Sequence, residues 1–461
     1  MTTSRVKIHL QKTRIGQVFC VLLLSALIQS VAMAAGTNEA YGIETPAQRE
    51  ARLAWWREAR FGMFIHYGPV ALTGREISWS RANSNPKCPN KGPTPVEVYD
   101  NLYKDFNPTN FNANEWAGIA KMAGMKYVVL TAKHCDGFLL WDSKVDSYNM
   151  MATPYKHDLC AELAKAVRRQ GLRLGWYFSP MDWRDPDFRT ERNDAFVGRM
   201  QGELKELFNH YGRIDLVWFD FDGKEAPYDQ ANTYAIVKRA QPRIVMDNRL
   251  DLGLHAKNTE MKSPLADYYT PEQQIGAYDD AHPWETCMTL GTQWSWKPDD
   301  KIKTAAETIG ILARTAGGDG NLLLDVGPMP DGRIEPRQVE VLKQVGAWMD
   351  RNGQSIYGTR GGPFKPSEFG SSTRKGRTIY VQVLKWLDGP LKLPSLPGKI
   401  VSAKILGNGG KADARETEDG IEITVAAGDR DASDTVVALK FDGDVMKFLA
   451  VEVAPGKTAG K

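Results

Sequence analysis

The sequence predicts an α/β fold, a (β/α)8 TIM-like barrel, followed by a small C-terminal antiparallel β-sandwich. First, apolar segments that end in polar residues alternate about eight times with helix-like or loop-rich stretches, as the strands and crossover helices of such a barrel do. Second, short β-branched runs replace this alternation after roughly residue 358. Third, 461 residues with 42% hydrophobic and 25% charged side chains suit one large domain with an accessory domain.

The predicted barrel strands are continuous apolar runs, which is typical of parallel strands buried on both faces. Between two of them, residues 158–170 carry apolar side chains at helical spacing and stop at Gly171, a residue that suits a helix end. Residues 196–211 carry a second helical stripe, closed by Gly212. The strands are predicted at residues 61–68, 127–133, 172–179, 214–221, 243–248, 267–272, 284–290 and 321–327.

An open doubly wound sheet is the alternative α/β architecture. It would carry a glycine-rich phosphate loop after an early strand, whereas the glycine-rich stretch at residues 317–320 precedes a predicted strand. The barrel is therefore favoured, with limits at residues 45–358, and the β-sandwich is expected at residues 359–461. The sandwich strands are predicted near residues 377–386, 399–406, 420–427 and 435–442, with turns rich in Gly, Asp and Pro between them.

Residues 1–34 are predicted to be a secretory signal peptide. This segment holds four basic residues and no acid, an apolar run begins at residue 18, and small residues suit cleavage after Ala34 or Ala35. Polar residues interrupt the apolar run, which is also short for a membrane span. We therefore expect a secreted or periplasmic protein without membrane attachment after cleavage.

Charge and composition argue against several partner and cofactor classes. The formal net charge is +3 and falls to −1 without the four basic residues of the signal segment, which disfavours general binding of nucleic acid. The seven histidines show neither HxH nor HExxH spacing, and no cysteines form a close CxxC pair. We therefore expect no metal site. The 13 Trp, 16 Tyr and 16 Phe suit stacking on sugar rings as well as an ordinary core.

The strand predicted at residues 214–221 becomes acidic at its far end. Because side chains alternate along a strand, Trp218, Asp220 and Asp222 are expected to point the same way. A carboxylate at the C-terminal end of a barrel strand, beside an indole that can hold the apolar face of a sugar, suits the nucleophile of a retaining glycosidase. From the residues alone, Asp220 could equally be a buried structural acid, and Asp222, beside Gly223, a turn residue.

A retaining glycosidase also needs a carboxylic acid that protonates the leaving oxygen. Glu272 and Glu285 both lie at or near predicted strands, and sequence spacing does not choose between them. Either could instead be a structural acid that accepts hydrogen bonds from backbone amides in a loop. The sequence therefore offers two candidates for the acid and base.

Three further residues at strand ends are candidates for binding sugar hydroxyls. His66 and His134 have aromatic neighbours, and Arg249 offers a fork of donors, although a histidine with satisfied hydrogen bonds in the core is the ordinary alternative. Cys135 follows His134, but adjacent residues of a strand face opposite sides, so a nucleophilic pair of the two is not expected.

Five motifs follow one another in a distinctive order along roughly residues 45–365. They are FGMFIHYG at 61–68, KHCDGF at 133–138, WFD at 218–220, NLLLDVGP at 321–328 and SIYGT at 355–359. Together they resemble the α-L-fucosidases of glycoside hydrolase family 29, and several motifs in register are not expected by chance.

The resemblance implies a secreted barrel with a C-terminal β-sandwich that releases terminal L-fucose by a retaining mechanism without metal or organic cofactor. The family nucleophile is the Asp after Trp-x at the fourth strand, here Asp220. Asp222 is the alternative, because this chain reads WFDFDG where WFDG is frequent. Glu272 lies in the Thr-x-Glu setting of the family acid and base, and Glu285, in a Trp-Glu pair, is its rival.

The resemblance also implies residues that bind the sugar, with two departures from the family pattern. Cys135 stands where many relatives have a second histidine. Trp79 lies where a Glu-Trp pair usually stands, but Ser78 replaces the Glu, and Glu76 could compensate. The positions that match fucose contacts are His66, His134 and Arg249, with Trp218 beside the nucleophile.

The predicted activity is hydrolysis of terminal α-L-fucosyl linkages, and the predicted partner is a fucosylated glycan or polysaccharide. The departures motivate one alternative, a catalytically degenerate secreted protein that only binds fucose. A second alternative keeps hydrolysis but changes the sugar, to an α-galactoside for example, because one small group in a pocket is worth only ~1–3 kcal/mol.

Overall fold

The computed structural model describes residues 44–82, 92–220, 228–250, 265–386 and 389–454. The predicted signal segment, residues 1–34, and the alternative nucleophile Asp222 therefore lie outside the described residues. Within the described ranges, no helix has both the length and the apolar character that crossing a membrane requires.

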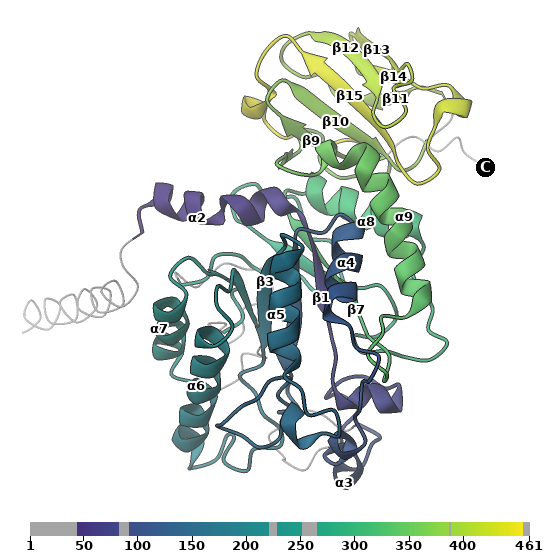
Figure 1. Cartoon of the computed structure of the whole chain (residues 1–461). Helices are drawn as coiled ribbons and strands as arrows, with labels where there is room; N and C mark the ends of the chain where they lie inside the picture. Colours follow the sequence, from purple (N-terminus) through teal and green to yellow (C-terminus); the bar gives the residue numbers. More distant parts are fainter. Residues whose placement is uncertain (1–43, 83–91, 221–227, 251–264, 387–388, 455–461) are drawn as a thin grey trace, which may run out of the picture.

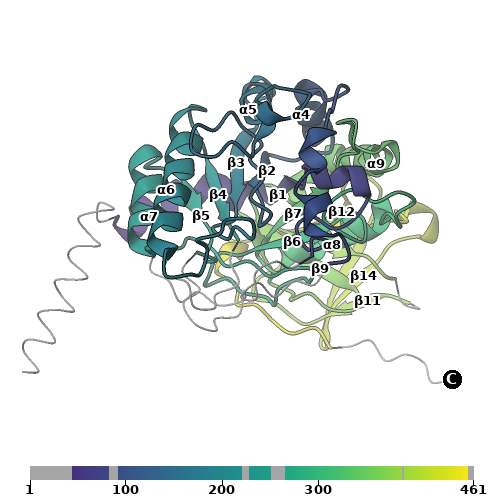
Figure 2. The ribbon, with the colours of Figure 1, turned by 90° about the horizontal axis from the view of Figure 1, so that it is seen from below.

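A curved seven-stranded parallel sheet forms the centre of the larger part of the chain (Figures 1 and 2). Its order is β5-β4-β3-β2-β1-β7-β6, and each described pair of neighbours is parallel. The carboxyl ends of these strands therefore share one edge. The bounds are β1 Phe61–Ile65, β2 Tyr127–Lys133, β3 Arg173–Phe178, β4 Leu216–Phe219, β5 Val245–Met246, β6 Glu285–Thr289 and β7 Asn321–Val326.

The strand predicted at residues 267–272 is not a regular strand in the structure. Single parallel bridges join Asp247 to Tyr268 and Tyr269 to Trp284, so residues 268–269 lie between the segments that contain β5 and β6. Pro271, which lacks an amide proton, follows two residues later and limits the length of a ladder here. The other predicted barrel strands correspond to β1 to β7.

Helices α4 to α9 alternate with the strands along the chain and pack on the outer face of the sheet (Figure 1). In the helix predicted at 158–170, the side chain of Asp158 accepts from the amide of Ala161 at 2.7 Å, and Gly171 takes a φ of 75° just beyond the end. The helices are α2 Pro46–Ala59, α3 Val96–Tyr99, α4 Ala113–Met122, α5 Leu159–Arg169, α6 Asn193–Asn209, α7 Gln230–Ala240, α8 Ala305–Gly317 and α9 Pro336–Asn352.

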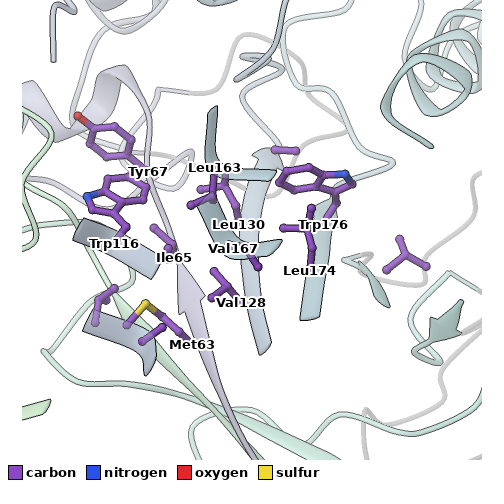
Figure 3. Packing of buried hydrophobic residues seen from close by; sticks show 14 of the residues in the cluster. Met63, Ile65, Tyr67, Trp116, Val128, Leu130, Leu163, Val167, Leu174 and Trp176 are labelled. Atoms are coloured by element: carbon purple, nitrogen blue, oxygen red, sulfur yellow. The ribbon is translucent and has the colours of Figure 1, made fainter. Parts of the chain in front are cut away.

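Alternate side chains of the parallel strands divide into two apolar clusters. The outer cluster packs the sheet against the helices, and Figure 3 shows Met63, Ile65, Val128, Leu130, Leu163, Val167, Leu174 and Trp176 within it. The inner cluster includes Phe64, Val129, Tyr177, Trp218 and Leu323. Burying each large side chain contributes roughly 1.5–3 kcal/mol, so both faces hold the strands in register. Leu53 and Trp56 of α2 also belong to the inner cluster.

The C-terminal part is an antiparallel β domain made of two sheets (Figure 1). One apolar cluster contains side chains from both, including Ile379 and Val437 of the larger sheet and Ile421 of the smaller, so the sheets pack face to face. The four runs predicted from sequence correspond to β10, β12, β14 and β15. The strands are β8 Arg360–Gly361, β9 Gly370–Lys375, β10 Thr378–Val383, β11 Leu391–Leu393, β12 Ile400–Ile405, β13 Asp413–Thr417, β14 Gly420–Thr424 and β15 Thr435–Phe441.

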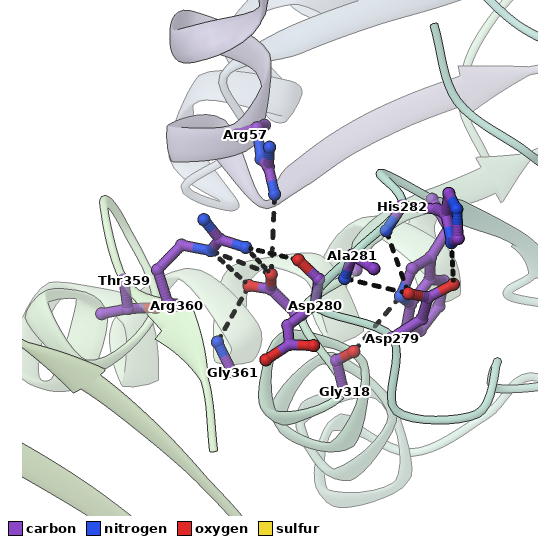
Figure 4. Close-up of polar contacts among 12 residues, drawn as sticks. Arg57, Asp279, Asp280, Ala281, His282, Gly318, Thr359, Arg360 and Gly361 are labelled. Atoms are coloured by element: carbon purple, nitrogen blue, oxygen red, sulfur yellow. Dashed lines mark hydrogen bonds and ion pairs between the residues drawn. The ribbon is translucent and has the colours of Figure 1, made fainter. Parts of the chain in front are cut away.

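A buried ionic cluster joins α2 and β8 to the segment before β7. Asp319 accepts from Arg60 and Arg360 and from the amide of Gly361. Arg57 lies 3.8 Å from the same carboxylate, and Figure 4 labels Arg57, Arg360 and Gly361 of this cluster. Burial alone would raise the pKa of Asp319, but the Arg60 charge and the Arg360 hydrogen bonds hold it below its usual value. The cluster thus contributes to the contact between the two parts of the chain.

Candidate active site

Arg249 holds two of the predicted carboxylates at the same edge of the parallel sheet. Its Nη1 donates to Asp220 at 2.7 Å, and its Nη2 donates to Glu272 at 2.8 Å. Asp220 directly follows β4, Arg249 follows β5, and Glu272 follows the bridges at Tyr268 and Tyr269. The common direction of the parallel strands therefore brings side chains 52 residues apart in sequence around one guanidinium.

The Arg249 side chain is buried and held from several directions. Its Nε donates to the Thr270 hydroxyl at 2.8 Å, and its Cζ lies 4.3 Å from the centroid of the Trp218 ring. Burial alone would lower the pKa of Arg249, but the charges of Asp220 and Glu272 outweigh it and raise that pKa. Arg249 is therefore a fixed cation between two carboxylates.

The two carboxylates remain accessible to a ligand. The Asp220 side chain is 25% exposed and the Glu272 side chain 38% exposed, whereas that of Arg249 is 4% exposed. The Tyr177 hydroxyl donates to the second Asp220 oxygen at 2.7 Å. Asp220 is thus oriented by two donors, and Glu272 stands nearer to solvent.

Both predicted histidines lie beside this carboxylate pair. The His134 ring stacks on Tyr177 with centroids 5.3 Å apart and planes 2° apart, and the His66 and His134 centroids are 5.7 Å apart. Burial lowers the pKa of His134 to about 3 and lowers that of His66 well below its usual value. Nδ1 of His66 lies 2.6 Å from Oδ1 of Asp325. Near neutral pH both histidine rings are therefore uncharged, and they act as hydrogen-bonding groups.

Trp218 and Cys135 are placed inside the protein. Trp218 is 2% exposed, stacks on Tyr177 at 5.6 Å and lies beneath the Arg249 guanidinium. Cys135 is 1% exposed, belongs to the outer apolar cluster, and its Sγ lies 3.2 Å from the Ser179 hydroxyl. Both residues are therefore too buried to touch a ligand directly, and they pack behind the residues that line the site.

Trp79 and its neighbours lie at the outer side of the site. The Trp79 side chain is 45% exposed and meets Trp183 edge to face at 5.1 Å, while Ser78 contacts His134. Glu76 accepts from the amides of Trp294 and Ser295, at 3.0 and 3.3 Å. Glu76 thus anchors the loop that carries Trp294.

Glu285 lies at the opposite end of the parallel strands. It is the first residue of β6 and pairs in register with Asn321, the first residue of β7. Its carboxylate is fully buried and accepts from Trp56 Nε1 at 3.1 Å and from the Tyr127 hydroxyl. Burial raises the pKa of Glu285 to about 7. The structure thus groups Glu272, and not Glu285, with Asp220.

Two residues of the site were not predicted from sequence. Tyr177 links Asp220 to His134, and strand alternation could have indicated it, because it pairs in register with Trp218. Trp294 is half-buried, with its ring centroid 4.8 Å from that of His66. It follows β6 in a loop that shows no sequence periodicity. Among the described residues, no group of three His, Cys, Asp or Glu side chains is arranged to hold a metal ion.

Comparisons with known proteins agree with this fold. A family model described as alpha-L-fucosidase matches residues 28–354. Human plasma alpha-L-fucosidase is 32% identical over 393 residues, which cover 77% of this chain and 82% of the relative. Alpha-L-fucosidase isoenzyme 1 from Paenibacillus thiaminolyticus has a TM-score of 0.77 and 33% identity over 86% of this chain and 99% of its own.

A second solved structure is described as a trapped covalent intermediate. It is an alpha-L-fucosidase of glycoside hydrolase family 29 from Bacteroides thetaiotaomicron, in complex with 2-fluoro-fucosyl fluoride. Its TM-score is 0.73 with 26% identity, covering 86% of this chain and 96% of that one. The family match, the curated relatives and the shared fold together show that this chain is a glycoside hydrolase that belongs to the alpha-L-fucosidases of family 29.

Proposed function

We propose that the protein hydrolyses terminal α-L-fucosyl linkages of glycans or polysaccharides with retention of configuration, using Asp220 as nucleophile and Glu272 as acid and base. The observation that carries the proposal is the guanidinium of Arg249, which binds both carboxylates at once. A retaining mechanism needs two carboxyl groups about 5–5.5 Å apart on either side of the scissile bond. Two carboxylates on one guanidinium fork suit a separation of that size.

In the first step, an oxygen of Asp220 attacks the anomeric carbon while Glu272 gives its proton to the leaving oxygen. The bond to the leaving group breaks, and a glycosyl ester forms on Asp220. In the second step, Glu272 takes a proton from water, the water oxygen attacks the anomeric carbon, and Asp220 leaves as carboxylate. The covalent intermediate described for the Bacteroides relative supports this two-step course.

The surroundings of the carboxylates suit their different tasks. Asp220 accepts from Arg249 and Tyr177, which hold its carboxylate in one orientation for attack. Glu272 has one charged partner and a more exposed side chain, which suits a group that meets the leaving oxygen and then water. Glu285 is enclosed at the other strand end, which is why Glu272 is preferred.

The sugar is proposed to lie against the two histidines and the indoles of Trp79 and Trp294. His66, His134 and Arg249 would hydrogen-bond its hydroxyls, and Trp79 and Trp294 would offer apolar faces to the ring and its methyl group. Trp218 would act from beneath by holding Arg249 in place.

We further propose that residues 268–269 close the sheet into a barrel. The bridges from Asp247 to Tyr268 and from Tyr269 to Trp284 support the closure.

We also propose that residues 1–34 direct export, so that the mature enzyme is secreted or periplasmic. N-terminal sequencing of protein recovered outside the cytoplasm tests export, and an uncleaved N-terminus would contradict it.

The deciding experiment is turnover of an aryl α-L-fucoside by Asp220→Gly, Asp222→Gly, Glu272→Ala and Glu285→Ala. We expect Asp220→Gly to be inactive and to recover product formation with azide, and Glu272→Ala to lose most activity. Wild-type turnover by Asp220→Gly with an inactive Asp222→Gly would overturn the assignment. A panel of other aryl glycosides tests the related-sugar alternative, and fucose binding without turnover would support the degenerate one.

A further inference from the structure

Ser78 is held tightly beneath His134. Its backbone has a φ of 55°, in the left-handed region that few residues other than glycine adopt, and the residue is fully buried. Its amide donates to the Tyr99 hydroxyl at 2.8 Å, and its Oγ accepts from the Asp136 amide at 2.9 Å. The Tyr99 hydroxyl donates to Asp136 at 2.6 Å, which closes the ring of contacts. The position of the Ser78 hydroxyl is therefore fixed by its surroundings.

The Ser78 hydroxyl faces one particular nitrogen of His134. Its Oγ lies 2.5 Å from Nδ1 of the ring. Oγ accepts from the Asp136 amide, and donation of its own proton to Nδ1 would use the hydroxyl as acceptor and donor at once. A neutral imidazole that accepts at Nδ1 carries its proton on Nε2. Burial lowers the pKa of His134 to about 3, which agrees with a neutral ring.

The other nitrogen of His134 is left for the ligand. Nε2 has no hydrogen bond to any residue in the described ranges, and stacking on Tyr177 at 2° fixes the plane in which it points. The ring lies beside the carboxylate pair, because Tyr177, on which it stacks, donates its hydroxyl to Asp220 at 2.7 Å. The proton on Nε2 would therefore meet a bound sugar.

We propose that Ser78 is a positioning residue that holds His134 in the Nε2–H tautomer, so that His134 donates a hydrogen bond to one substrate oxygen. The proposal deepens the proposed function and rests on the role of His134 in binding the sugar. It also assigns a role to Ser78, which stands where the family resemblance leads one to expect a glutamate. A carboxylate here could only accept from Nδ1–H, which would leave a lone pair on Nε2 and reverse the hydrogen bond to the sugar.

The direct test is the ¹⁵N spectrum of the unliganded enzyme labelled on histidine. The chain has only seven histidines, and His134→Gln assigns the signal. We expect a proton on Nε2 and an unprotonated Nδ1 in the wild type and a mixture of tautomers in Ser78→Ala. A wild-type ring with its proton on Nδ1 would overturn the proposal, as would an unchanged spectrum in Ser78→Ala.

Kinetics give a second readout. We expect Ser78→Ala to raise KM for an aryl α-L-fucoside roughly fivefold to tenfold with a smaller change in kcat. Ser80→Ala is the matched control, because the buried Ser80 Oγ has no hydrogen-bond partner among the described residues. An unchanged KM in Ser78→Ala contradicts the inference. The spectrum needs no turnover, so failure of the Asp220 mechanism and failure of this inference are distinguishable.

Discussion

The hydroxyl of Tyr177 donates to Asp220 at 2.7 Å from a ring that is itself stacked between His134 and Trp218. One side chain of β3 therefore sets both the orientation of the proposed nucleophile and the plane of the His134 ring, which is proposed to bind the sugar. The hydroxyl stabilises the Asp220 carboxylate, while the ring determines where His134 lies. These two contributions can be separated by substitution.

Tyr177→Phe keeps the stacked ring and removes the donor to Asp220. A hydrogen bond to a charged group contributes about 1.5–3 kcal/mol, so kcat/KM for an aryl α-L-fucoside should fall roughly tenfold to a hundredfold with little change in melting temperature. Tyr211→Phe is the matched control, since it removes a Tyr-to-Asp hydrogen bond of 2.7 Å, to Asp158, away from the site. Equal activities of the two variants would contradict the role of Tyr177.

Arg249→Lys tests the importance of the guanidinium fork. A lysine keeps the positive charge but lacks the planar pair of donors that contact Asp220 and Glu272 at 2.7 and 2.8 Å. We expect kcat to fall about a hundredfold or more, because the two carboxylates lose their common orientation. Steady-state kinetics with Arg173→Lys as control, whose partner Asp215 lies elsewhere, measures the difference. Retention of more than half the wild-type kcat by Arg249→Lys would count against the proposed geometry.

Glu285→Gln tests the enclosed carboxyl group at the other strand end. Burial raises the pKa of Glu285 to about 7, so the folded protein binds this proton more tightly than the unfolded chain does. Wild-type stability should therefore decrease as pH rises from about 4.5 to 7, relative to a glutamine that does not titrate, by up to about 3 kcal/mol. Urea unfolding of both proteins at pH 5 and pH 7.5 measures this.

The same variant also checks the choice of acid and base. Glu285→Gln should gain stability over the wild type between those two pH values and should keep kcat within a few-fold. A pH-independent difference in stability would show that Glu285 is ionised in the folded protein. A loss of kcat comparable to that of Glu272→Ala would favour Glu285 as the acid and base.

Asp319→Asn tests the ionic cluster between the two parts of the chain. The variant leaves the buried Arg60 and the partly buried Arg360 without their carboxylate, and removing one partner of a buried ion pair costs about 3–5 kcal/mol. Denaturant unfolding should show this loss, whereas KM should stay unchanged in conditions where the protein is folded. Asp280→Asn, at an exposed position, is the control. Equal stability of the two variants would mean that the cluster contributes little.

Much of the fold could be predicted because the period of apolar residues depends on local geometry. Parallel strands buried on both faces give continuous apolar runs, and β1, β2, β3, β4 and β7 all lie within predicted segments. The stripe ending at Gly171 predicted α5 for the same reason. The segment at 267–272 was predicted as a strand and forms only single bridges, since strand pairing depends on its neighbours in space as well as on its own residues.

The site was predictable where a residue ends a strand and unpredictable where it enters from a loop. Asp220, His66 and His134 follow strands, so their common edge could be inferred from the order of the segments. Trp294 could not, because the loop after β6 is positioned by the amide contacts of Glu76 and not by any periodic pattern. Trp218 was expected to point the same way as Asp220, but its burial beneath Arg249 depends on a partner 31 residues away in sequence.

The sequence by itself determined the alternation of strands and helices, the family motifs and the chemical identity of the candidate acids. Only the tertiary structure decided which of Glu272 and Glu285, two glutamates 13 residues apart, lies beside Asp220. The first lies beyond the carboxyl ends of the strands with Arg249, and the second lies at their amino ends with Trp56. The physical reason is that the type of a residue determines which hydrogen bonds it can donate or accept. Its charge state and its partners depend on burial and distance, and these are set only when remote segments pack together.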